Sequence, residues 1–483
     1  MTPARREAAL PFLLVALAFV LYAPCLTAPV YLDDGPYVFG SAFLRAPAAA
    51  FWTTLFSPHY FAATAERTWQ PLVSALNRLF LDWPALLRAL SVLLHALCAW
   101  LVYRLSGRAL AAGLLLVFPL AAEAVFFAAF KGHLLAAAAA LGALLAWREG
   151  RRGLSAVLLA LGLLCKETAL VIGPLLFLHA VLVERLKPVE ALRRLTPHAV
   201  LAAVYLLLRF GWLAALLELL VPSEPRPLAA LAWYLGALVW PPAPGFFRAF
   251  PEGDAWVLLL LAPYGALLWA RRREPENLFL LLWPLAALLP FLHLIPFAAK
   301  SPVADRYLYL AAAGACWGLS RSDHKRARVA LAVLVVLWGW GTLKRTTLYR
   351  DADALAAAGA WAAPHSAAAQ QFLAQSALSR EDFATAVSAS ERAARLEPRD
   401  PQNWTWLGIA RQSAKRPDAE AAFRKALDIQ ETPQARANLG AFLEDAGRPA
   451  LALKEYDRAA ELAHEWEKPR RLAAELRARS KRR

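Results

Sequence analysis

Apolar and polar positions alternate along this chain on the scale of whole helices. Apolar runs lie at 8–25, 85–105, 109–127, 129–147, 153–168, 169–186, 197–218, 255–270, 277–295, 306–319 and 327–343. A helix that crosses a bilayer needs about 20 predominantly apolar residues. The pattern therefore predicts an all-α fold, a polytopic membrane helical bundle with about 11 spans over residues 1–350.

Two apolar segments allow more than one interpretation. The first run follows the basic sequence "ARRE" and resembles a signal peptide, but no small-residue cleavage site follows it, so an uncleaved first helix is the preferred prediction. The segment 227–243, "PLAALAWYLGALVWPPA", carries Trp, Tyr and a double proline. These residues favour an interfacial or re-entrant helix over a twelfth span.

After residue 350 the sequence becomes alanine-rich and charged, and it contains a repeat. The stretch 404–429 aligns with 436–462, so that Leu407-Gly408 matches Leu439-Gly440 and Phe423 matches Tyr456. A weaker copy precedes them and ends at "LEPRDP". Small residues at a helix crossing, an aromatic residue and a terminal proline predict tetratricopeptide (TPR) helix pairs over 351–466. The last residues, 467–483, are predicted to form a basic tail that is the solvated, frayed end of a helix, with attraction to anionic lipid as the alternative.

The distribution of charged residues predicts how the helices are oriented in the membrane. The chain is 59% hydrophobic and 19% charged, with a net charge of +16. Lys and Arg gather between apolar runs, as in "REGRRG", "RRREPE" and "SRSDHKRARV", which is typical of cytoplasmic loops and not of a nucleic-acid module. We therefore predict a multi-pass protein of the cytoplasmic (inner) membrane, with a cytoplasmic N-terminus and an extracytoplasmic repeat domain.

Ionisable residues within apolar runs are costly and usually mark a cavity or a partner. On the predicted topology most of them gather near the outer face, below the long extracytoplasmic loop 26–83 that carries Asp33 and Asp34. They are Arg88, His95, Glu123, Lys131, His133, Lys166, Glu167, Arg209, Asp305 and Arg306. A cavity that holds both carboxylates and cations at the outer membrane face is the simplest explanation.

Such a cavity suits a ligand with an anionic head and an apolar tail. Lys and Arg bind phosphate oxygens, apolar helices hold a lipid chain, and a carboxylate takes a proton from an incoming hydroxyl. These parts describe a transferase that uses a polyprenyl-phosphate sugar. We expect Asp33 or Asp34 to act as the general base and Glu123 to orient the base or the acceptor.

Several motifs together resemble the GT-C superfamily of glycosyltransferases, in particular its protein O-mannosyltransferase-like branch with C-terminal TPR repeats. They are "YLDDGPYV", "TWQPLVSALNRLF", "LLHALCAWLVY", "FPLAAEAVFFAAFKGHLLA", "LLCKETAL", "LHLIPF" and "DRYLYL". The resemblance implies a hexosyltransferase that moves a mannose-like sugar from a polyprenyl-phosphate donor to a protein or glycan acceptor. Departures from the family pattern occur at Gln70, Phe118 and Ala122.

The resemblance also implies roles for residues. The aspartate pair holds the catalytic carboxylate, and basic residues of the later motifs contact the donor phosphate. On this basis Lys131, Lys166, Arg306 and Arg209 are the expected phosphate-binding residues, supported by Glu167, His95, Asp305 and Tyr307. The repeats would dock the acceptor or a partner protein, and no cofactor is expected.

Other interpretations stay open from the sequence. Asp33-Asp34 followed by Gly35-Pro36 also suits a turn, and adjacent carboxylates are ordinary ligands of a divalent metal. His95 is equally expected to be a core histidine bonded to a neighbouring helix. The whole chain is also compatible with a membrane-anchored TPR scaffold for envelope assembly, or with a transporter of lipid-linked sugars.

Overall fold

The computed structural model describes residues 3–64, 68–213, 226–251, 253–292, 294, 301–463 and 467–481. Within these residues every regular element is a helix and none is a strand, which confirms the all-α prediction. The chain forms two compact units. Unit 1 comprises residues 1–243 and 250–351, and unit 2 comprises 244–249 and 352–483.

Unit 1 contains long apolar helices joined by short helices and turns. In chain order its elements are α1 (Pro3–Leu26), η1 (Gly35–Phe39), α2 (Ala42–Arg45), α3 (Ala48–Leu55), α4 (His59–Thr64), α5 (Pro71–Leu79), α6 (Pro84–Ser106), α7 (Ala109–Leu116), α8 (Ala121–Phe126), η2 (Ala128–Phe130), α9 (Lys131–Arg148), α10 (Arg152–Cys165), η3 (Glu167–Val171), α11 (Ile172–Leu182), α12 (Pro188–Arg194), α13 (Thr196–Leu213), α14 (Pro227–Val239), α15 (Ala255–Arg271), α16 (Pro275–Leu288), η5 (Leu289–Phe291), η6 (Asp305–Leu308), α17 (Tyr309–Ser320) and α18 (Lys325–Leu348).

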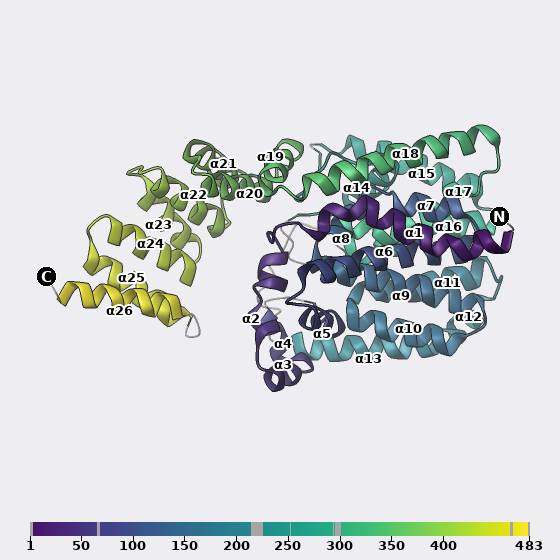
Figure 1. The fold of residues 1–483 in the computed structure, drawn as a ribbon, viewed down its shortest axis with the longest axis horizontal. Coiled ribbons are helices and arrows are strands. Elements are labelled where there is room, and N and C mark those ends of the chain that lie inside the picture. Colours follow the sequence, from purple (N-terminus) through teal and green to yellow (C-terminus); the bar gives the residue numbers. More distant parts are fainter. Residues whose placement is uncertain are drawn as a thin grey trace. The chain divides into compact units, whose positions relative to one another are not determined.

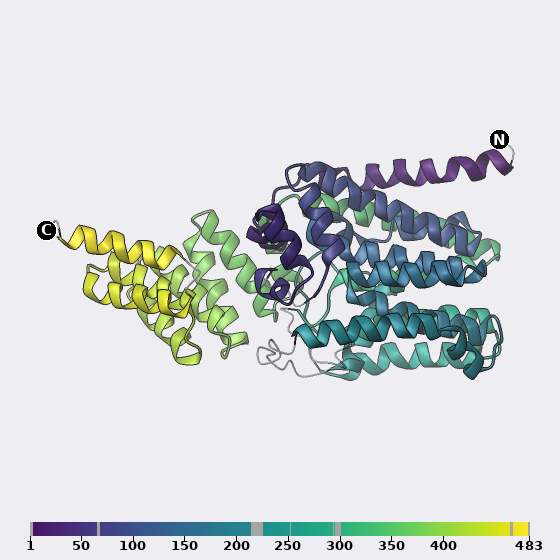
Figure 2. The same ribbon diagram turned by 90° about the horizontal axis from the view of Figure 1, so that it is seen from below.

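The long helices of unit 1 lie side by side (Figures 1 and 2). Neighbours pack in the order α18, α1, α6, α9, α10 and α13. Several begin with proline, which lacks the N–H that a first helical turn leaves unpaired; Pro84 starts α6 in this way. The same helix ends at Gly107, whose φ of +67° is a left-handed conformation that glycine adopts without strain.

The prediction of about eleven spans is wrong for the described residues. Four helices there are long and apolar enough to cross a membrane, at Glu7–Leu26, Pro84–Ser106, Ala128–Arg148 and Lys325–Leu348. A fifth is counted if α12 and the helix after it, which meet at 62°, form one bent span. Other apolar runs are broken by turns. The run 109–127, for example, is divided into α7 and α8 around Phe118-Pro119.

Two further segments of unit 1 differ from simple loops. The predicted loop 26–83 contains η1 and the short helices α2 to α5, so its side chains are placed by local helical structure. The segment predicted to be interfacial or re-entrant forms α14, a 13-residue helix. Its Tyr234 is fully buried, whereas Val239 and Trp240 at its end are 79% and 83% exposed.

Unit 2 is a series of helix pairs. Its elements are α19 (Ala352–Ala362), α20 (Ala367–Ser379), α21 (Phe383–Leu396), α22 (Pro401–Ser413), α23 (Ala419–Ile429), α24 (Pro433–Asp445), α25 (Pro449–Leu462) and α26 (Glu467–Lys481). Successive helices pack on one another, most closely α20 with α21, α22 with α23 and α24 with α25. This is the helix-pair arrangement of TPR-like repeats.

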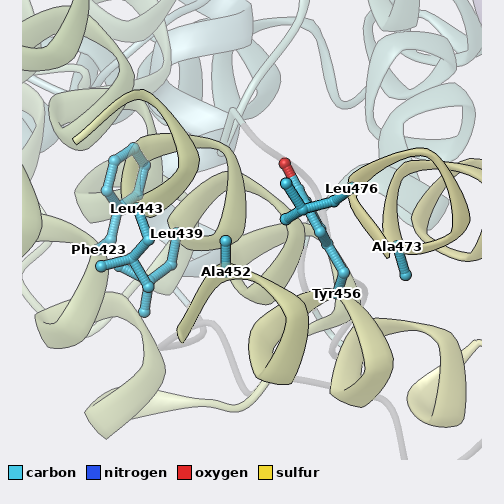
Figure 3. Close-up of a cluster of buried hydrophobic side chains, with 7 residues drawn as sticks. All are labelled: Phe423, Leu439, Leu443, Ala452, Tyr456, Ala473 and Leu476. Carbon is cyan, nitrogen blue, oxygen red and sulfur yellow. The ribbon is translucent and has the colours of Figure 1, made fainter. Parts of the chain in front are cut away.

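The repeat motif has a direct packing reason. A side chain at Gly408 would lie 2.5 Å from the ring of Phe423, and one at Gly440 would lie 2.7 Å from the ring of Tyr456. The glycine therefore lets the second helix bring its aromatic ring against the first. Figure 3 shows the resulting core, which contains Phe423, Leu439, Leu443, Ala452, Tyr456, Ala473 and Leu476.

The predicted tail is helical, as expected, but over residues 467–481 one of its faces packs on the repeats and is not solvated. This segment forms α26, and its Ala473 and Leu476 are buried in the core shared with the last repeat. Since a stack of helix pairs leaves an apolar face at each end, a final helix that covers this face stabilises it. In addition, the segment Pro244–Ala249 belongs to unit 2, where Phe247 packs on Phe372 with ring centroids 6.1 Å apart.

Candidate functional site

The predicted site residues come from the same end of the unit 1 helices. Asp33 and Asp34 follow the C-terminal end of α1, Arg88 is in the first turns of α6, and Lys131 begins α9. Lys166 follows the C-terminal end of α10. Helices α6 and α9 start at the end of the layer where α1 and α10 finish, and α1, α6, α9 and α10 pack as successive neighbours, so these positions all lie at one end of the layer (Figure 1).

Asp34 is buried, with only 1% of its surface exposed. Its Oδ1 accepts a hydrogen bond from the backbone N–H of Ala129 at 2.9 Å, and its Oδ2 lies 3.5 Å from Nη2 of Arg88. The same guanidinium group donates to the carbonyl oxygens of Ala28 and Pro29. Arg88 thus ties the start of the first loop to the carboxylate and fixes its position.

Burial and the neighbouring groups shift the pKa of Asp34 in opposite directions. Burial removes water from the carboxyl group and raises its pKa, and this effect outweighs the hydrogen bond from Ala129 and the charge of Arg88, which both lower the pKa. A buried carboxyl group with a raised pKa is a recurring feature of functional sites.

Asp33 is placed differently from its neighbour. Its side chain is only partly buried, and its charge lies within electrostatic range of Arg306. Arg306 in turn forms an ion pair with Glu123, which is completely buried, and donates its backbone N–H to Oε2 of Glu123 at 3.0 Å. The guanidinium carbon of Arg306 also lies 4.3 Å from the ring centre of Phe130. The structure therefore groups Asp33, Glu123 and Arg306.

Lys131 is completely buried close to Asp34. Its Nζ donates to Oδ1 of Asn77 at 3.2 Å and to the carbonyl oxygen of Ala128 at 3.3 Å, and the charges of Asp34 and Arg88 both act on it. Asn77 and Ala129 line a small cavity of about 20 Å³, enough for one or two water molecules.

A third group of residues connects Lys166 to the same site. His133 is buried two residues after Lys131, and the charges of Lys166 and Arg306 both act on it. The ring of Tyr307 lies 5.5 Å from that of His133 and stacks on Phe291 with centroids 4.1 Å apart. Lys131 on α9 and Arg306 on η6 thus lie within electrostatic range of the aspartates, and Lys166 at the end of α10 lies within range of His133.

Three of the predicted site residues have other contacts. The ring nitrogens of His95 face the Tyr309 hydroxyl at 2.6 Å and the Leu116 carbonyl at 3.1 Å, so His95 is bonded to neighbouring helices as a core histidine is. Arg209 lies 4.0 Å from Glu167. These contacts do not place His95 or the Arg209–Glu167 pair among the residues around Asp33 and Asp34.

Asp305 also has a partner that the sequence did not indicate. Its Oδ2 lies 3.2 Å from Nη1 of Arg345, and both side chains are buried. Arg345 belongs to the basic sequence "LKRTTLYRD" and is in the last turn of α18, where it also donates to the carbonyl oxygen of Pro242.

Sequence reasoning missed Arg345 and Asn77 as members of this region and did not assign Arg88 a role. A charge inside an apolar run was the available signal for Arg88. No signal in the sequence pointed to Asn77, because only the packing of α5 against α9 brings it to Lys131. The motif "LHLIPF" lies largely outside the described residues, which exclude 293 and 295–300.

Metal binding has no support in the described part of the chain. No group of three or more His, Cys, Asp or Glu side chains converges there in a way that could hold a metal ion. The four cysteines are all buried and unpaired with one another. The side chains that the site offers are carboxylates, ammonium and guanidinium groups, an imidazole and a phenol.

Comparison with known proteins gives little further information. No protein family matches the sequence, and no curated protein matches it. Among solved structures, the chain is similar to a thermophilic TPR protein from Thermus thermophilus, with 18% identity and a TM-score of 0.25. The match covers 45% of this chain and 97% of the other.

Proposed function

We propose that the chain is an integral-membrane glycosyltransferase that takes a mannose-like sugar from a polyprenyl-phosphate donor and gives it to a protein or glycan acceptor outside the cytoplasmic membrane. The observation that supports the proposal is the grouping of Asp33 with Glu123 and Arg306, next to Asp34, which is buried with Arg88 and Lys131. The charge of Lys166 reaches the same region through His133. The motifs that resemble GT-C transferases lie on the same residues.

Asp33 is better placed than Asp34 to act as the base. A general base must reach the hydroxyl group whose proton it removes. Asp33 is partly exposed, whereas Asp34 is almost fully buried and holds the Ala129 N–H and Arg88. In the proposed reaction Asp34 positions the loop and Asp33 accepts the proton.

The reaction then follows from the chemistry of the donor. The acceptor oxygen forms a bond to the anomeric carbon, and the bond from that carbon to the phosphate oxygen breaks. The lipid phosphate leaves with the electron pair, and the acceptor proton passes to Asp33. Lys166 and Arg306 stabilise the charge that develops on the phosphate, as cations placed beside a leaving group do.

Unit 2 supplies a docking surface in this proposal. Stacks of TPR-like helix pairs present extended surfaces that bind peptides and proteins. We assign unit 2 the binding of the acceptor protein, or of a partner that delivers the acceptor.

The test uses the purified full chain in lipid nanodiscs with polyprenyl-phosphate mannose and an extracytoplasmic protein acceptor. Release of polyprenyl phosphate is measured for Asp33→Asn and Asp34→Asn. We expect at least one variant to lose about 100-fold or more in rate, the usual contribution of a general base. Asp82→Asn is the control, because Asp82 is in the same loop with its side chain 81% exposed.

Retained thermal unfolding temperatures would show that the variants are folded. Full activity of both asparagine variants would remove the assignment of the base. No donor turnover by the wild-type chain, with any polyprenyl-phosphate sugar, would contradict the transferase itself.

A membrane-anchored TPR scaffold is the second candidate. It is favoured by the way the buried charges pair with one another, since Glu123 holds Arg306 and Asp305 holds Arg345. The small volume of the cavity beside Asn77 points the same way. A scaffold predicts that Asp33→Asn and Asp34→Asn leave the cellular function intact, whereas loss of unit 2 contacts abolishes it.

A further inference from the structure

A second polar site lies at the other end of the unit 1 helices. A cavity of about 380 Å³ opens between the start of α10, the short helix α12 and the start of α13. Its lining includes Arg152, Arg193 and Arg194 together with Glu190. Helix α10 has 14 residues and so is about 21 Å long, which separates this cavity from Lys166 at the opposite end of the helix.

The cavity lining carries more positive than negative charge, with three arginines and one glutamate. Arg194 is neutralised by Glu190 and lies 3.9 Å from Glu184. Arg152 and Arg193 form no ion pair within the described part of the chain, and both are exposed. Two guanidinium groups are therefore available to an anion from outside the protein.

The floor of the cavity and the surfaces beside it are apolar. Ala156 and Pro197 contribute to the lining. Beyond it, α10 and α13 expose apolar side chains at helical spacing, namely Leu154, Val157 and Leu161 on α10 and Val200, Val204 and Leu207 on α13. The two helices pack against each other, so these faces continue away from the arginines along the same pair of helices.

Helix α12 has the features of a segment that lies at a membrane surface. It meets the following helix at 62°, it buries Ala191 against the protein, and it exposes Val189 and Leu192 to 61% and 59%. Arg193 is beside these apolar residues on the same short helix. Apolar side chains next to arginines are typical of helices at the boundary between head groups and acyl chains.

From these observations we infer that the cavity binds an anionic phospholipid, with its phosphate between Arg152 and Arg193 and an acyl chain along the exposed faces of α10 and α13. Basic pockets between apolar helices are recognised sites for acidic lipid head groups. A soluble phosphate compound would use the arginines but would gain nothing from the apolar faces. The ligand chemistry that fits both features is therefore a phosphate ester with a hydrocarbon chain.

The experiment measures lipid retention by native mass spectrometry. Delipidated full chain is mixed with equal amounts of phosphatidylglycerol and phosphatidylcholine, and the bound lipid is counted. We expect the wild type to retain phosphatidylglycerol in preference. The double variant R152Q/R193Q should bind phosphatidylglycerol at least about tenfold more weakly than the wild type, because each arginine near a lipid phosphate makes a substantial electrostatic contribution.

The matched control is R326Q/R328Q, which removes the same charge from two exposed positions in the first turn of α18. It should retain phosphatidylglycerol as the wild type does. Equal loss in the control, or equal retention of phosphatidylcholine by the wild type, would overturn the proposal.

A last arm separates a lipid from a free phosphate compound. Glycerol phosphate at the same concentration should leave the thermal unfolding temperature unchanged, whereas phosphatidylglycerol should raise it. An equal rise with glycerol phosphate would replace the lipid with a soluble ligand and overturn the inference. None of these measurements depends on sugar transfer, so their failure is distinct from failure of the proposed function.

Discussion

Two adjacent aspartates illustrate how position decides chemistry at the scale of single residues. Asp34 is buried, accepts the Ala129 N–H and faces Arg88, whereas Asp33 is partly exposed and near Arg306. The sequence predicted that the pair is functional but offered no means to choose between its members. Burial distinguishes the two residues, because a buried carboxylate with fixed partners, such as Asp34, is better suited to positioning a loop than to contacting a substrate.

A prediction about pH follows from Asp34. Burial raises the pKa of its carboxyl group above the ordinary value of about 3.9. If the ionised form holds Arg88 and the loop in place, sugar transfer should fall as the pH decreases through this raised pKa. The rate of transfer between pH 4 and pH 8 checks this, and we expect the acid limb to lie above pH 4. A rate that stays constant down to pH 4 would contradict it.

The raised pKa of Asp34 also affects the stability of the fold. A raised pKa in the folded state means that folding favours the protonated carboxyl group. This contribution is fully present below the unfolded-state pKa and is lost as the pH rises through the folded-state pKa. Asp34 therefore costs stability at neutral pH, which is expected of a residue kept for function.

Contacts between secondary-structure elements explain most of the differences between expectation and structure. The TPR motif was read correctly because its residues are local, with Gly408 and Phe423 only 15 positions apart in one helix pair. The number of spans was predicted wrongly, because hydropathy depends on apolar composition and does not detect the turns that break an apolar run. Turns and short helices interrupt several apolar runs, as between α7 and α8.

A prediction at this scale concerns the core of the repeats. Phe423 is completely buried and packs with Leu439 and Leu443. Replacement of a buried phenylalanine by alanine usually lowers the free energy of unfolding by about 3–5 kcal/mol. Phe423→Ala should therefore unfold unit 2 at lower temperature, as measured by circular dichroism of the full chain. Leu451→Ala, at a position that is 38% exposed, should have little effect; an equal loss in both variants would contradict the packing.

The whole molecule joins an apolar helical unit to a repeat unit, and the helix before the repeats, α18, is one of the candidate spans. Basic residues lie at its start, in the segment that we predict to be cytoplasmic. If α18 crosses the membrane, its two ends face opposite compartments. With the predicted orientation, we expect the repeats to lie outside the cytoplasm.

Cysteine labelling tests this topology with little background, since Cys25, Cys98, Cys165 and Cys316 are all buried. A membrane-impermeant maleimide added to intact spheroplasts should label Ala450→Cys in α25 and leave Ser322→Cys unlabelled. Both positions are exposed in the structure. Labelling of both variants from one side would show that α18 does not span the membrane.

The sequence alone determined what depends on composition and on short-range pattern. Residues close together in the sequence determine helical periodicity, apolar content and the spacing of Gly408 with Phe423. They also identify the candidate charges within apolar runs. Tertiary structure decided which of these charges meet. Arg345 and Asp305 are 40 positions apart, and Lys131 reaches Asn77 only because two helices pack together. Local propensity fixes the helices, but the partners of a buried charge depend on how distant helices pack, and no single stretch of sequence specifies that.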